Sequence, residues 1–121
     1  MAELIRAICV DDNAHIRDLM AEALKLIEVD LIAAYASAEE FLEDKSTGVY
    51  EDADLFIFDV RLPNMSGLEL AAKLRAEGEK RPIVAVSAWD PPREKLEACG
   101  VVFLRKPFAL EELKDTLKTL A

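Results

Sequence analysis

Cysteine is scarce in this chain. Only two of its 121 residues are cysteines, Cys9 and Cys99, too few for the disulfide framework that small secreted domains use in place of a large core. A chain that is not a disulfide scaffold is suited to a reducing compartment, and we expect the protein to be cytoplasmic. We interpret both cysteines as small buried hydrophobic residues.

Positive charge is also in short supply. The chain has 15 Lys and Arg residues against 24 Asp and Glu residues, and a formal net charge of −9. An acidic chain is poorly suited to neutralising phosphates or anionic lipid headgroups, so we expect no direct binding to nucleic acid or to a membrane. The apolar runs are too short to cross a bilayer, and no signal peptide opens the chain.

Apolar residues, by contrast, make up 52% of the chain, enough for the core of one domain, which we assign to residues 1–121. Five apolar segments alternate with amphipathic ones, which predicts an α/β fold with a parallel sheet covered by helices on both faces. Right-handed crossovers favour a flavodoxin-like (βα)5 arrangement, a doubly wound five-stranded parallel sheet of order 2-1-3-4-5. The predicted strands are Leu4–Val10, Leu31–Tyr35, Leu55–Phe58, Pro82–Val86 and Val101–Leu104.

Capping residues and apolar spacing locate the helices. Asn13 and Ser37 are suited to cap the first two. The third is expected to begin near Ser66-Gly67, and a short helix is expected between Pro91-Pro92 and Gly100. The polar segment Asp44–Asp54 is predicted to be a mobile loop. Residues expected on the buried faces of the third and last helices are Leu68, Ala71, Ala72, Leu74, Leu110, Leu113, Leu117 and Leu120.

Polar residues follow four of the predicted strands where they end. Asp11 and Asp12 follow the first, Asp59 the third, Ser87 the fourth, and Lys106 comes soon after the fifth. The carboxyl ends of parallel strands share one rim, so these side chains are predicted to be neighbours. Three carboxylates in one place repel each other unless a cation joins them or some stay protonated. This pattern predicts a Mg²⁺ site.

The chemistry of each group suggests a role. Asp12 and Asp59 can ligate Mg²⁺, and Asp11 can hold one of its waters. The other oxygen of Asp59 can act as a nucleophile toward phosphorus. Lys106, the Ser87 hydroxyl and the Ala88 backbone N–H can stabilise the transferred phosphoryl oxygens.

The ordered set Asp11-Asp12, Asp59, Pro63, Gly67, Ser87 and Lys106-Pro107 resembles the receiver domain of bacterial two-component response regulators, in particular chemotaxis-regulator-like receivers. The resemblance implies that Asp59 accepts a phosphoryl group from a sensor histidine kinase or a histidine phosphotransfer protein. It implies Mg²⁺ bound by Asp12, Asp59 and the Arg61 carbonyl. It also implies a switch pair, Ser87 and Phe103, that controls a target-binding face made by the short fourth helix, the fifth strand and the last helix.

Some residues differ from those common in that family. Phe103 stands where tyrosine is common, and Ser87 replaces the commoner threonine. The stretch between Ser87 and Lys106 is short, so we expect a short or displaced helix there. Trp89 and Arg61 are expected to flank the phosphoryl pocket, with the guanidinium over the indole, and to slow hydrolysis of the acyl phosphate.

Two other functions remain open from the sequence. One is an aspartate-nucleophile phosphatase of the haloacid dehalogenase type, although Arg61 stands where that class has a second aspartate. The other is a receiver-like interaction module that never takes phosphate. The sequence also leaves open whether the chain is a stand-alone receiver or part of a longer protein.

Overall fold

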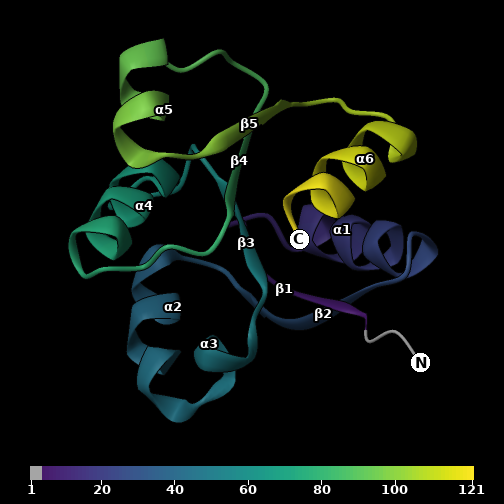
Figure 1. Ribbon diagram of the computed structural model, residues 1–121, viewed down its shortest axis with the longest axis horizontal. Coiled ribbons are helices and arrows are strands. Elements are labelled where there is room, and N and C mark those ends of the chain that lie inside the picture. The colour runs from purple at the N-terminus through teal and green to yellow at the C-terminus, as the bar shows by residue number, and fades with distance from the viewer. Residues whose placement is uncertain (1–3) are drawn as a thin grey trace.

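A computed structural model describes residues 4–121. Its five strands form one parallel sheet of order β2-β1-β3-β4-β5, which confirms the predicted topology (Figure 1). The strands are β1 Ile5–Val10, β2 Val29–Tyr35, β3 Leu55–Asp59, β4 Ile83–Ser87 and β5 Val102–Arg105. The helices are α1 Ala14–Leu26, α2 Ala38–Asp44, the 3-10 turn η1 Lys45–Thr47, α3 Val49–Asp52, α4 Gly67–Ala76, α5 Arg93–Cys99 and α6 Leu110–Leu120.

The sheet lies between two helical layers. Helices α1 and α6 cover one face, and α2, α3, α4 and α5 lie on the other (Figure 1). Every residue of β3 and β4 is buried, as expected for central parallel strands with helices on both faces. Side chains alternate between two apolar cores, one under each layer. The buried strands therefore hold the residues at their carboxyl ends on a rigid base.

The segment Asp44–Asp54 differs from the predicted loop. It carries η1 and α3, and Tyr50 on α3 is only 7% exposed. Tyr50 stacks on Phe56 and meets the ring of Phe41 edge-on. The prediction was wrong because one aromatic residue, in an otherwise polar stretch, buries enough apolar surface to anchor the segment.

Two helical positions also differ from expectation. Ala72 on α4 is exposed, whereas Leu70 faces the core beside Ala71 and Leu74. Leu110 is 41% exposed because α6 begins there, one turn before the buried Leu113. Helix α5 is short, as predicted, with 7 residues.

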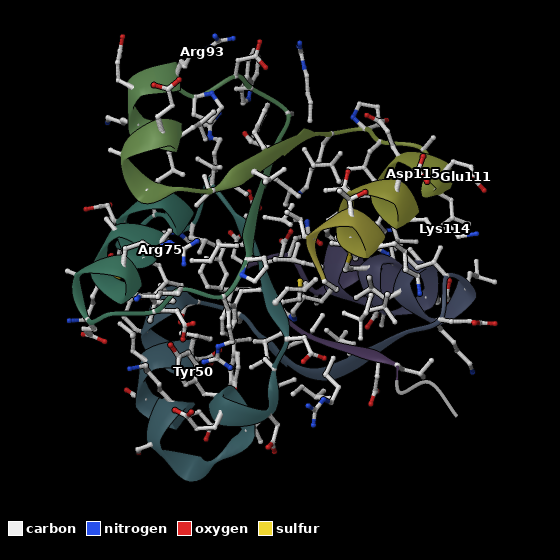
Figure 2. All side chains as sticks on the ribbon, viewed as in Figure 1. Tyr50, Arg75, Arg93, Glu111, Lys114 and Asp115 are labelled. Carbon is white, nitrogen blue, oxygen red and sulfur yellow. The ribbon has the colours of Figure 1, made fainter. Side chains whose placement is uncertain are left out.

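Two arginines hold the amino-terminal side of the sheet, opposite the rim where the predicted site lies. Arg81 donates to the carbonyls of Tyr50 and Ala53, both at 2.8 Å, and pairs with Glu79. Arg75 donates from Nε to the Cys99 carbonyl at 2.9 Å and from Nη2 to the Gly100 carbonyl at 3.0 Å. Figure 2 shows Tyr50 and Arg75 on the same side of the sheet. Arg75 therefore ties the end of α5 to α4.

No helix between residues 4 and 121 is both long enough and apolar enough to cross a bilayer.

Candidate functional site

Three aspartates meet at the carboxyl rim of the sheet. Asp11 follows β1, Asp12 comes next, and Asp59 ends β3. One carboxylate oxygen from each lies within 4.8 Å of the others. Asp11 and Asp59 are buried and Asp12 is exposed, so solvent reaches the cluster from the Asp12 side. The structure brings together the three carboxylates that the sequence placed at this rim.

Among the described residues, Lys106 forms the ion pairs with this cluster. Its Nζ lies 3.2 Å from Asp11 Oδ2 and 3.6 Å from Asp59 Oδ2. Its backbone N–H donates to the Ser87 carbonyl at 2.8 Å, and the peptide bond to Pro107 is cis. One lysine faces three carboxylates, which leaves an excess of negative charge at the rim.

Burial raises the pKa of Asp59 above its ordinary value, and the nearby carboxylates of Asp11 and Asp12 raise it further. Lys106 and the Arg61 N–H, which donates to Asp59 Oδ1 at 3.1 Å, act in the opposite direction. A carboxylate in this position is poorly solvated, so a further cation close to it would stabilise its charged form.

The loop that carries Asp11 and Asp12 is held from α1. Asn13 caps the helix by accepting from the Ile16 N–H, as predicted, and its own N–H donates to Asp11 Oδ1 at 3.0 Å. Arg17 reaches back past the start of α1, and its Nη1 donates to the Asp11 carbonyl at 2.7 Å. The sequence analysis missed Arg17, because a side-chain bond to a backbone carbonyl leaves no signal in residue spacing.

Gly67 packs against the site backbone. A Cβ atom at this position would lie 2.1 Å from the Asp59 carbonyl oxygen and 2.8 Å from its carbon. Both are main-chain atoms, so no side-chain rotation would relieve the clash. Glycine is required here for close approach and keeps the start of α4 against the end of β3.

Ser87 is buried at the end of β4, and its Oγ accepts from the Trp89 N–H at 3.1 Å. Phe103 is half-buried on β5, where it pairs with Ala85, two residues before Ser87. The two residues expected to form a switch pair thus lie on adjacent strands. Their coupling stays a prediction.

The residues predicted to flank the pocket line two different grooves. Arg61 and Trp89 line a groove of about 500 Å³ between α4 and α5, together with Ser87. Ala88 lines a second, apolar groove of about 360 Å³ with Lys106, next to α1. Among residues 4–121, the cation–ring contacts are those of Lys45 and Arg81 with Tyr50 and Phe56. The expected stacking of Arg61 on Trp89 is therefore absent.

The fold and the site together define the class of this protein: it is an α/β protein whose doubly wound parallel sheet carries an acid cluster, a lysine and a hydroxyl at its carboxyl rim. The family model of the response regulator receiver domain matches residues 7–118. Response regulator MprA of Mycobacterium leprae is 31% identical over 121 residues, and its counterpart in Mycobacterium tuberculosis is 30% identical over 119. Each match covers 96% of this chain and 50% of the relative, so the chain spans about half the length of these curated relatives.

Solved structures agree. The chemotaxis protein CheY4 of Vibrio cholerae superimposes with a TM-score of 0.84 at 26% identity, over 98% of this chain and 100% of its own. A CheY-like receiver domain from Methylobacillus flagellatus gives 0.81 at 28% identity, with the same coverage. The complex of CheX, CheY, BeF3⁻ and Mg²⁺ from Borrelia burgdorferi shows the same fold, with a TM-score of 0.85 at 16% identity over 95% of this chain and 87% of that chain. The chain belongs to the response regulator receiver domain family of two-component systems.

Proposed function

We propose that this receiver domain is a phosphorylation switch in which Asp59 accepts a phosphoryl group in a Mg²⁺-dependent reaction. The donor is a phosphohistidine on a sensor histidine kinase or on a histidine phosphotransfer protein. The observation that carries the proposal is the cluster of Asp11, Asp12 and Asp59 around Lys106 at the carboxyl rim of the sheet. A structural module without phosphate chemistry would have no need to gather three like charges there.

The residues fit a Mg²⁺ ion. Three carboxylates and one ammonium leave two negative charges, which a divalent cation balances. Mg²⁺ prefers oxygen ligands at about 2.0–2.1 Å and keeps several waters, so three oxygens within 4.8 Å of one another need only a small closure. Asp12, Asp59 and the Arg61 carbonyl would hold the ion, and Asp11 would hold one of its waters. When bound, the ion offsets negative charge on the phosphoryl oxygens.

The chemistry belongs to Asp59. One of its oxygens attacks phosphorus as the bond from phosphorus to the donor imidazole breaks, and the imidazole leaves and takes up a proton. The product is an acyl phosphate, with about one more negative charge than the carboxylate. Lys106 is placed to shift from the carboxylates to a phosphoryl oxygen, since its Nζ lies 3.6 Å from Asp59 Oδ2. Ser87, buried on the next strand, supplies a hydroxyl donor.

Output would pass through Ser87 and Phe103 to the face made by α5, β5 and α6, where a downstream protein would bind. Phe103 has no hydroxyl, so its coupling to Ser87 would depend on packing. The domain is a signalling unit, and the reactions proposed for it are its own phosphorylation and dephosphorylation. No observation favours the phosphatase or the phosphate-independent module.

Phosphorylation can be tested with acetyl phosphate or phosphoramidate, which need no partner protein. With Mg²⁺, the intact mass should rise by one phosphoryl group, and peptide mapping should place it on Asp59. Asp59→Asn should abolish the modification. Asp115 is an exposed aspartate on α6 (Figure 2), and Asp115→Asn should leave the modification unchanged. Phosphorylation of Asp59→Asn at the wild-type rate would refute the assignment.

A further inference from the structure

Trp89 is the largest exposed apolar side chain among the described residues. The residue is 65% exposed, and it is the single tryptophan of the chain. It lies between Ser87, which ends β4, and Arg93, which begins α5. An exposed indole gains free energy from any accessible apolar cavity that would remove it from water.

The backbone of Trp89 is anchored to a group of the site. Its N–H donates to Ser87 Oγ at 3.1 Å. This is the hydroxyl that a phosphoryl group on Asp59 would recruit. A rotation of Ser87 that carries Oγ away from the Trp89 amide would break this hydrogen bond and release the loop.

A groove with an apolar floor lies beside Trp89. It measures about 500 Å³ and runs between α4 and α5, with Leu68, Ala72, Ala98 and Cys99 among its lining residues. Val60, Ser87 and Trp89 itself also border it, so it is continuous with the site. The groove offers the apolar surroundings that the indole lacks in its present position.

The two ends of helix α5 differ in their side-chain contacts. Arg75 ties the carbonyls of Cys99 and Gly100 to α4, whereas among the described residues no side chain caps the start of α5 after Pro92. Near this start, Asp90 forms an exposed ion pair with Arg105 at 3.6 Å, which is a weak restraint. Arg93 lies at the end of α5 away from this tether (Figure 2). The segment that carries Trp89 can therefore shift while the far end of α5 stays in place.

We propose that Trp89 is an internal sensor of phosphorylation: when Ser87 turns to the phosphoryl group, the Trp89 loop is released and the indole enters the groove between α4 and α5. The inference rests on the proposed function, because the phosphoryl group on Asp59 is the trigger. Closure removes an exposed indole from the surface next to α5.

The test uses the intrinsic fluorescence of Trp89. Binding of BeF3⁻ with Mg²⁺, a phosphoryl mimic, is first established by ¹⁹F NMR, which does not depend on the tryptophan. On binding, the emission maximum should shift to the blue and acrylamide quenching should weaken, since the indole leaves water. In Ser87→Ala, which lacks the hydroxyl, the emission should be the same with and without the mimic.

A pair of variants on α4 tests the groove itself. Ala72 and Ala76 are both exposed, one turn apart, and only Ala72 lines the groove. Ala72→Leu should fill the space and abolish the blue shift while BeF3⁻ still binds. Ala76→Leu adds the same side chain outside the groove and should behave as wild type.

The outcomes separate the two proposals. If BeF3⁻ does not bind, the proposed function fails and the sensor fails with it. If it binds and Trp89 stays as red-shifted and as easily quenched as before, the proposed function survives and the sensor is refuted. A blue shift that persists in Ala72→Leu would also refute it, because the indole would then be entering some other environment.

Discussion

Gly67 is the position where the site backbone leaves no room for a side chain. Alanine there would place Cβ 2.1 Å from the Asp59 carbonyl oxygen, so the end of β3 must move. We expect Gly67→Ala to lower the free energy of unfolding by about 3 kcal/mol, the upper end of the usual cost of overpacking. It should also slow phosphoryl acceptance, because Asp59 moves with its backbone. Urea unfolding and the rate of acetyl phosphate labelling measure the two effects.

Gly100→Ala is the comparison variant. Gly100 has a φ of 61°, but the nearest atom to a Cβ there is Arg75 Nε at 3.8 Å. The free energy of unfolding should fall by about 1–2 kcal/mol, the cost of an alanine in the left-handed conformation. The rate of acetyl phosphate labelling should stay unchanged. If Gly67→Ala is labelled as fast as wild type, the close approach of Gly67 to Asp59 has no role in the site.

Most residues of the site could be predicted from the sequence, because the position of a residue at a strand end determines which other residues lie beside it. The alternation of strands and helices predicted one shared rim, and the structure brings together there Asp11, Asp12, Asp59 and Lys106. Arg17 and the Trp89 amide could not be predicted in the same way. Their contacts depend on how a side chain folds back on a loop, and residue spacing carries no record of that.

Among the elements, the connection between α4 and β4 depends on Glu79. Hydrogen bonds from Arg81 hold the pKa of Glu79 at about 2, below its ordinary value of 4.5, and the Tyr50 hydroxyl also donates to it. A depressed carboxyl pKa stabilises the fold above the ordinary value, and this contribution fades as the pH falls from 4.5 toward 2.

We therefore expect Glu79→Gln to be less stable than wild type at neutral pH and to approach it as the pH falls below the ordinary carboxyl value. Urea unfolding of both proteins across this range gives the difference at each pH. Glu111→Gln, at an exposed position on α6 (Figure 2), controls for the loss of one negative charge. A difference between wild type and Glu79→Gln that does not shrink in acid would exclude the depressed pKa as its source.

The order of the strands followed from the alternation of elements and the handedness of the crossovers, and the structure confirms it. The helical turns in Asp44–Asp54 did not follow. Tyr50 packs on the ring of Phe41 from α2 and on that of Phe56 from β3. Arg81 donates to the carbonyl of Tyr50, which lies 31 residues earlier in the sequence. These contacts are tertiary, so the local pattern of a short polar stretch held little information about them.

For the whole molecule, we expect the net charge of −9 and the acid cluster to make the stability of the fold depend on divalent cations. A ligand that binds only the folded state stabilises it by mass action, by roughly 1.4 kcal/mol at ten times its Kd. Mg²⁺ at that level should raise the melting temperature by about 5 °C relative to EDTA.

Asp12→Asn should lose this rise in melting temperature. In EDTA it should be at least as stable as wild type, because it removes one of three repelling carboxylates. Asp115→Asn on α6 has the same formal charge as Asp12→Asn and should keep the Mg²⁺ response. An equal response in Asp12→Asn and wild type would place the stabilising ion elsewhere on the acidic surface.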